Sequence, residues 1–304
     1  CRTLGLTEVG LDMDFYELGG HSLLAISLLS KMRAAFNINI NAATLSQTRT
    51  IRGLSKIIQS HVQEESDNTS LVVLQQGDHS RPPLFLIHPV GGTVFCYLPL
   101  VKALPNDLTI IALQDPSIEK GRPLFLSVEE MATYYRTLIQ QHQPHGPYYL
   151  GGASFGASVA TEIAHQLLEA KEAVRFLGLI DGWRKFSETK FDIHYVQAII
   201  NHHISSNNNG SINHLENQTL WEALLQHRLE MMVQYRHKKL PIQLTLFKAT
   251  ELLPEYKKMD AVDNHWSPYS AFPIHVFSIM GDHNTLLQDP HVAMLAKCIV
   301  SVLV

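Results

Sequence analysis

The sequence is poor in cysteine and lacks the long apolar runs of a membrane protein. Its 304 residues include only three cysteines, Cys1, Cys96 and Cys298, which form neither a C-x-x-C pair nor an even framework. Such cysteine usage is typical of a reducing compartment, so we expect a cytoplasmic protein rather than a secreted one. No run approaches the roughly 18 apolar residues that span a bilayer, so we expect no membrane partner.

Charge is also sparse, at 17% of residues with a net charge of -4, which gives no electrostatic reason to expect a nucleic-acid partner. The chain has no Walker loop, no dinucleotide fingerprint and no H-E-x-x-H zinc motif. His202 and His203 lie near His194, but adjacent histidines point to different sides of a helix, so we expect no metal site. Hydrophobic residues, at 45%, suffice for a sizeable core, and the length favours two domains.

Residues 1–60 predict a small all-α bundle. The stretch D-F-Y-E-L-G-G-H-S, residues 14–22, leads into a dense apolar helical pattern that continues to Phe36, and a second helix is expected to begin near Thr50. Ser22 thus starts a helix. It has two interpretations: an N-cap, or a hydroxyl that carries a phosphodiester, which the free amides and macrodipole of a helix N-terminus stabilise. The polar residues 61–69 predict a linker.

Residues 70–304 contain seven apolar runs, separated mostly by segments long enough for helices. This alternation predicts an α/β domain with a mostly parallel sheet covered on both faces. The runs are Leu71–Leu74, Leu84–His88, Leu108–Ala112, Tyr148–Gly152, Arg175–Asp181, Ile242–Lys248 and Ile274–Met280. Residues 183–241 form a long insertion with helical patches, which we interpret as a lid. Peripheral packing without gating is the alternative.

The stretch Tyr148–Ala160 predicts a strand, a sharp turn and a helix. Ser154 stands between Gly152 and Gly156, the two positions where a Cβ would collide with neighbouring backbone at a strained turn. Ser154 would then project above the sheet edge as a nucleophile. A glycine-rich turn with an idle serine is the alternative for the motif alone.

Two further polar side chains follow predicted strands at the same edge of the sheet. Asp181 ends the apolar run that follows the helix predicted after Ser154, and His283 follows the last apolar run. Ser154, Asp181 and His283 stand in the order of an α/β-hydrolase triad, in which the imidazole takes the serine proton and the acid orients the imidazole.

Other carboxylates compete for the position of the acid. Glu251, after the penultimate strand, is the runner-up. Asp115 precedes the nucleophile and breaks the order, and the side chain of Asp282 diverges from its neighbour His283 on an extended segment.

A glycine-rich turn, H-P-V-G-G at residues 88–92, follows the second predicted strand. Its exposed amides suit an oxyanion hole, with one N–H from Val90 and the other from Phe155 after the nucleophile. His88 is interpreted as a residue that shapes or packs the turn, because the base follows the nucleophile in this chain order.

The stretch D-F-Y-E-L-G-G-H-S-L-L, residues 14–24, resembles the attachment motif of peptidyl carrier domains in non-ribosomal peptide synthetases. The resemblance covers about 60 residues and implies that Ser22 bears a 4′-phosphopantetheine arm, added by a phosphopantetheinyl transferase, whose thiol holds an acyl group. Only the tail of the usual first helix, about Cys1 to Leu4, is present, so we expect a truncated carrier cut from a longer polypeptide.

Residues 70–304 are similar to the thioesterase domains that end peptide, fatty acid and polyketide synthases. The matching pieces are P-P-L-F-L-I-H-P-V-G-G, G-P-Y-Y-L-G-G-A-S-F-G-A and G-D-H-N-T-L-L. The resemblance implies that a serine thioesterase releases a carrier-bound acyl or peptidyl thioester by hydrolysis or cyclisation, with upstream synthetase domains as partners. Two alternatives stay open: an esterase or lipase fused to an unrelated helical module, and a non-catalytic docking module.

Overall fold

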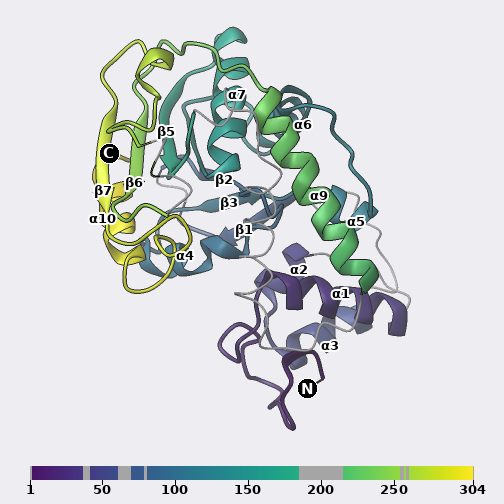
Figure 1. Ribbon diagram of the computed structural model, residues 1–304. Coiled ribbons are helices and arrows are strands. Elements are labelled where there is room, and N and C mark those ends of the chain that lie inside the picture. The colour runs from purple at the N-terminus through teal and green to yellow at the C-terminus, as the bar shows by residue number, and fades with distance from the viewer. Residues whose placement is uncertain are drawn as a thin grey trace.

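A small helical unit precedes a larger sheet unit along the chain (Figure 1). The computed structural model describes residues 2–36, 42–60, 70–78, 81–184, 215–253, 257 and 260–303. The predicted linker, residues 61–69, lies outside the described residues.

The helical unit contains the short 3-10 turn η1 (Arg2–Leu4) and the helices α1 (Ser22–Phe36), α2 (Ala42–Gln47) and α3 (Ile51–Ser60). The two helices that the sequence predicts are confirmed, and α1 begins at Ser22. The short α2 was not predicted. Apolar side chains of these elements and of the loop before α1 meet in one core. Its buried members from this unit are Phe15, Leu24, Ala25, Leu29, Met32, Leu45 and Leu54.

In the described part of the chain, seven strands form a single sheet in the order β1-β3-β2-β4-β5-β6-β7. The strands are β1 (Leu71–Gln75), β2 (Leu84–Ile87), β3 (Ile110–Leu113), β4 (Tyr148–Ala153), β5 (Val174–Ile180), β6 (Thr245–Ala249) and β7 (His275–Ile279). Only β1, at one edge, runs antiparallel to its neighbour. Each of the seven predicted runs is a strand, so the predicted fold class is confirmed.

Helices cover both faces of this sheet. Phe85 and Ile87 of β2 belong to the core shared with α6 (Val128–His142), α7 (Phe155–Glu169) and α9 (Leu215–Gln234). Leu84 and Leu86 belong to the opposite core, shared with η2 (Phe95–Tyr97), α4 (Leu98–Ala103) and α10 (Val292–Val302). Because successive side chains point to opposite faces, a strand buried between two helical layers is apolar at every position.

The predicted lid segment lies between β5 and β6. Its first part, residues 185–214, with His194, His202, His203 and the patch around Tyr195 to Ile200, lies outside the described residues. Its second part is the helix α9, as the apolar spacing predicts. His227 at the middle of α9 bonds the Phe125 carbonyl oxygen at 2.7 Å, and just after the helix the hydroxyl of Tyr235 donates to Glu162 of α7 at 2.8 Å.

The helical unit is seated against η2, α4 and the edge strand β1. The rings of Tyr16 and Phe95 are 5.4 Å apart, and Phe95 and Leu98 join the core of the helical unit. The Gln47 side-chain amide donates to the Val73 carbonyl oxygen of β1 at 3.1 Å. Apolar burial and one edge-strand hydrogen bond therefore hold the two units together in this arrangement.

Candidate active site

Ser154 occupies a strained turn between β4 and α7. Its φ is 54° and its ψ is −117°, outside the helical and extended regions. A Cβ at Gly152 would lie 2.3 Å from backbone atoms of Gly156, and a Cβ at Gly156 would lie 2.3 Å from the carbonyl oxygen of Ile87. Only glycine fits at either position, so the two glycines allow the chain to make the turn that exposes Ser154.

Three side chains from three loops at the carboxyl edge of the sheet meet at this turn. The imidazole Nε2 of His283 is 3.1 Å from the hydroxyl oxygen of Ser154. Its Nδ1 is 2.7 Å from Oδ2 of Asp181. The structure thus brings together the three residues that the sequence predicts as a triad, with the imidazole between the hydroxyl and the carboxylate.

Asp181 is held as a buried carboxylate, with 2% of its surface exposed. Burial raises its pKa, but the hydrogen bond and charge of His283, the Ala249 N–H and the Trp183 indole together lower the pKa below its ordinary 3.8. The Ala249 amide donates to Oδ1 at 3.0 Å and the indole donates to Oδ2 at 3.3 Å. A charged, hydrogen-bonded carboxylate fixes the imidazole with Nδ1 as the donor. Nε2, 3.1 Å from the Ser154 hydroxyl oxygen, is then the nitrogen that can accept the serine proton.

The competing carboxylates lie elsewhere. Glu251 is exposed, and its backbone N–H bonds the Gly281 carbonyl oxygen. Asp115 forms a buried ion pair with Arg228 at 2.6 Å. Asp282 accepts backbone N–H groups of Asn284 and Thr285, which shapes the loop that carries His283. Asp181 is therefore the carboxylate that the structure places against the imidazole.

The turn at residues 88–92 lines the same cavity as Ser154. Phe155, the residue after Ser154, begins α7. Val90 is buried at this turn, and the Gly92 N–H donates to the Pro89 carbonyl oxygen at 2.9 Å. The N–H groups of Val90 and Phe155 remain the predicted oxyanion hole.

His88 is completely buried below the turn. Its Nδ1 donates to the Pro89 carbonyl oxygen at 2.7 Å, and its Nε2 accepts from the Tyr135 hydroxyl at 2.9 Å. Its ring stacks on Phe155 with the centroids 5.8 Å apart. Burial lowers its pKa to about 4, so the imidazole is neutral at pH 7. His88 thus packs and bonds the turn, as its interpretation from the sequence proposed.

Tyr97 supports the backbone beside Ser154 and was not predicted from the sequence. Its buried hydroxyl donates to the Ile87 carbonyl oxygen at 2.5 Å and accepts the Ala153 N–H at 2.8 Å. It therefore ties the ends of β2 and β4 together directly before Ser154. No local pattern identifies it, because both partners are backbone groups of distant segments.

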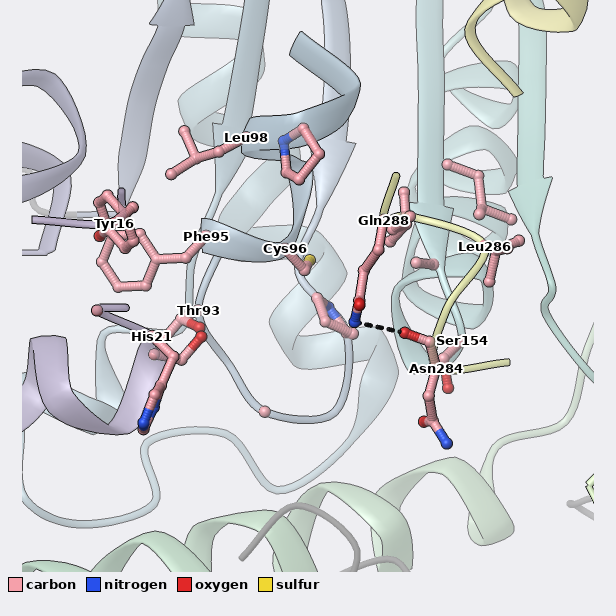
Figure 2. A pocket seen from close by; sticks show the side chains of 18 of the residues that line it. Tyr16, His21, Thr93, Phe95, Cys96, Leu98, Ser154, Asn284, Leu286 and Gln288 are labelled. Carbon is pink, nitrogen blue, oxygen red and sulfur yellow. Dashed lines mark hydrogen bonds between the residues drawn. The ribbon is translucent and has the colours of Figure 1, made fainter. Parts of the chain in front are cut away.

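A cavity of about 740 Å³ connects the two units. Tyr16 and His21 of the helical unit lie at one end and Ser154 lies at the other (Figure 2). Ser22 and His283 line the same cavity. Phe95 and Cys96 of η2 lie between the two ends (Figure 2). A group attached to Ser22, at the start of the 15-residue helix α1, would therefore face a continuous space that leads to Ser154.

Neither a metal-type cluster nor a membrane span is present among the described residues. These residues contain no cluster of three or more histidine, cysteine or acidic side chains that could hold a metal ion. No helix among them is long and apolar enough to cross a membrane.

The fold and the site together define the α/β-hydrolase class. The sheet is parallel except for one edge strand, a serine follows a central strand at a sharp turn, and an acid and a histidine follow later strands. Comparison with known proteins gives the family. Residues 82–301 match the family model for the thioesterase domain, and residues 1–58 match the model for the phosphopantetheine attachment site. The chain belongs to the thioesterase domain family, and its thioesterase domain is preceded by a carrier domain.

Curated relatives include much longer synthetases. The chain is 35% identical over 182 residues, 60% of its length, to a dimodular nonribosomal peptide synthase of Bacillus subtilis (strain 168). It is 27% identical over 305 positions, 99% of its length, to malpibaldin synthetase of Mortierella alpina. It spans only 8% and 6% of these two proteins.

Solved structures have a similar fold. A four-domain nonribosomal peptide synthetase in its holo form, bound to AMP and glycine, superimposes with a TM-score of 0.67 at 25% identity. The match covers 99% of this chain and 25% of that one. The NocB thioesterase domain, in covalent complex with a fluorophosphonate nocardicin G analogue, gives a TM-score of 0.61 at 25% identity, over 74% of this chain and 95% of that one.

Proposed function

We propose that this chain releases an acyl or peptidyl group from its own carrier domain, by transfer from a thioester at Ser22 to Ser154 and then to water or an internal nucleophile. One observation carries the proposal: the hydrogen-bonded series Ser154, His283, Asp181 opens into the same cavity as Ser22. Upstream synthetase domains would supply the thioester, in keeping with the greater length of the relatives.

The acyl transfer follows from the geometry of the triad. The Ser154 oxygen forms a bond to the thioester carbonyl carbon while its proton passes to Nε2 of His283. The carbon–sulfur bond then breaks and the imidazolium returns the proton to the leaving thiolate. In the second half, His283 takes a proton from water or from an amine or hydroxyl of the acyl chain, whose oxygen or nitrogen forms a bond to the ester carbonyl carbon. The ester carbon–oxygen bond then breaks and the proton returns to the Ser154 oxygen.

Charge develops on the carbonyl oxygen in both halves. We propose that the N–H groups of Val90 and Phe155 stabilise this negative charge by hydrogen bonds, since Val90 follows β2 and Phe155 begins α7 beside Ser154. Both donors belong to the backbone, and backbone donors held in place before the reaction need no reorganisation during it.

The residues around Ser22 fit a phosphopantetheine arm. The serine is partly exposed, stands at a helix N-terminus where free amides favour a phosphate, and lines the cavity. When bound, the arm supplies the thiol that carries the acyl group. A phosphopantetheinyl transferase is the partner that would attach it.

Two other functions compete with this one, and hydrolysis is the default mode of release. An esterase fused to an unrelated helical module would use Ser154 but leave Ser22 as an N-cap. A docking module would use neither serine. The cavity shared by Ser22 and Ser154 favours the carrier-linked enzyme, because an unrelated helical module has no need to place its first-turn serine there.

The test loads the full chain with a phosphopantetheinyl transferase and a series of acyl-coenzyme A compounds, and follows intact mass with time. We expect wild type to gain the acylated arm and then lose the acyl group. Ser154→Ala should gain the acyl group and keep it, and Ser22→Ala should gain nothing. Ser30→Ala, an exposed serine on the same helix, is the matched control and should load like wild type.

The released product separates the modes of release, since a cyclic product is lighter than the acid by one water. Equal loss of the acyl group in wild type and Ser154→Ala contradicts the proposal. A chain that no transferase loads, but that cleaves simple esters, supports the esterase. Failure of a fluorophosphonate to label Ser154 supports the docking module.

A further inference from the structure

Arg228 is a buried arginine on the inner side of α9 that the proposed chemistry does not use directly. It is 1% exposed, yet it comes from the segment inserted between β5 and β6. Its Nε donates to the Asp115 carboxylate at 2.6 Å, and its Nη1 donates to the Val90 carbonyl oxygen at 3.1 Å. A single guanidinium therefore joins α9, the loop after β3 and the turn that carries the predicted oxyanion donor.

The contact with Val90 acts on one of the two peptide planes that flank this residue. The plane before Val90, which contains its N–H, is held through the Pro89 carbonyl oxygen by His88 and by the Gly92 N–H. The plane after Val90 is held through its own carbonyl oxygen by Arg228. The direction of the N–H is set by the first plane, and Arg228 holds the carbonyl side of the same residue, so φ and ψ of Val90 are both restrained.

Asp115 and Gly92 support the guanidinium in this position. The Asp115 N–H donates to the Gly92 carbonyl oxygen at 2.9 Å, and its carboxylate also accepts the Ser117 N–H at 2.8 Å. Gly92 has a φ of 82°, and a Cβ there would lie 2.5 Å from Nη2 of Arg228. The second glycine of the turn thus makes room for the arginine, in addition to allowing the backbone conformation.

We propose that Arg228 is a positioning residue for acyl transfer, which holds Val90 from its carbonyl side, keeps the residue and its N–H in place for the oxyanion, and couples α9 to the proposed oxyanion hole. This inference rests on the proposed function of Ser154. A planar fork is required, because one group must reach the carboxylate and the carbonyl oxygen at the same time. Lysine can pair with Asp115 but presents a single nitrogen to both acceptors.

The experiment compares the wild-type chain with Arg228→Lys and with the double variant Asp115→Asn/Arg228→Met. The double variant removes both buried charges together, so neither charge is left unpaired. Arg175→Met, at an exposed arginine on β5, is the matched control. We expect kcat for an acyl thioester to fall about 100-fold in both variants, as for a misplaced oxyanion donor. KM should stay within about twofold of wild type, because ground-state binding does not use this donor.

A readout that a merely structural role would not move is the affinity for two inhibitors. A trifluoromethyl ketone forms an oxyanion with Ser154 and should bind the variants more weakly by the same factor as the loss in kcat/KM. A non-cleavable amide analogue of the substrate should bind all proteins alike. The inference is overturned if the folded variants keep kcat within about threefold of wild type, or if the two inhibitors lose affinity equally.

Failure of the proposed function has a different signature. If wild type does not turn over any carrier-bound thioester, the proposed function is wrong. The role of Arg228 is then tested by comparing the rates at which a fluorophosphonate labels Ser154 in wild type and in the variants. A normal labelling rate in the variants then rejects Arg228 independently.

Discussion

His88 makes the stability of the sheet domain depend on pH in a way that can be calculated. Burial lowers its pKa from 6.5 to about 4 in the folded chain. A histidine with a depressed folded pKa takes up its proton first in the unfolded chain, so its contribution to stability is complete above pH 6.5 and is lost as the pH falls toward 4. Between pH 7 and pH 5 this one group removes about 2 kcal/mol from the free energy of unfolding.

The perturbation is His88→Asn combined with Tyr135→Phe. Asparagine keeps a donor near the Pro89 carbonyl oxygen, and phenylalanine removes the hydroxyl that would lose its acceptor. Tyr135→Phe alone retains the titrating imidazole and is the control. Every other ionisable group is common to both proteins, so the difference between their pH profiles isolates His88.

The assay is urea unfolding at pH 7, 6 and 5, followed by tryptophan fluorescence. All three tryptophans, Trp183, Trp221 and Trp266, are buried in the sheet domain, so the signal reports this domain alone. The control should lose about 2 kcal/mol more than the double variant between pH 7 and pH 5. Parallel pH profiles for the two proteins would refute the assignment of a neutral, buried imidazole.

Three further predictions concern the nucleophile and its supports. Asp181→Asn replaces the acceptor of the imidazole proton with an amide, so kcat should fall about 10⁴-fold while the folded fraction, measured by circular dichroism, is unchanged. Gly156→Ala places a Cβ 2.3 Å from a carbonyl oxygen and should cost about 3 kcal/mol in urea unfolding, whereas Gly91→Ala, with nothing within 4 Å, should cost less than about 1 kcal/mol. Tyr97→Phe leaves the buried Ala153 N–H without its partner, so the same assay should show a loss of about 1–3 kcal/mol; a loss below about 0.5 kcal/mol would contradict the bridging role.

The sheet could be predicted because its strands are covered on both faces. Such strands appear as uninterrupted apolar runs, as in Leu84–Ile87 and Tyr148–Ala153, whose residues are all buried. The helix α2 left no comparable signal, since its sequence, A-A-T-L-S-Q, has one large apolar residue, Leu45, which is fully buried. A single buried position cannot establish a period.

The residues of the candidate triad could be identified for a similar reason. Strand order and chain direction determine which loops meet at one edge of a parallel sheet, so Ser154, Asp181 and His283 could be chosen by position alone. The supports of the site could not, because Tyr97 and Arg228 bond backbone carbonyl oxygens of distant segments. The one available signal for Arg228 was its spacing, for it occupies the apolar stripe of α9 between Leu225 and Met232.

The three-residue element η2 lies between the helical unit, which is the carrier, and the backbone beside Ser154. Its first residue, Phe95, contacts Tyr16 of the helical unit, and its last, Tyr97, bonds the backbone directly before Ser154. Cys96, between them, lines the cavity that joins Ser22 to Ser154. Consecutive residues of one short turn therefore contact the carrier, the cavity and the strand that precedes Ser154. A displacement of the carrier changes the contacts of Phe95, two residues from the hydroxyl that holds Ala153, so the surface that receives the carrier and the support of Ser154 belong to the same segment.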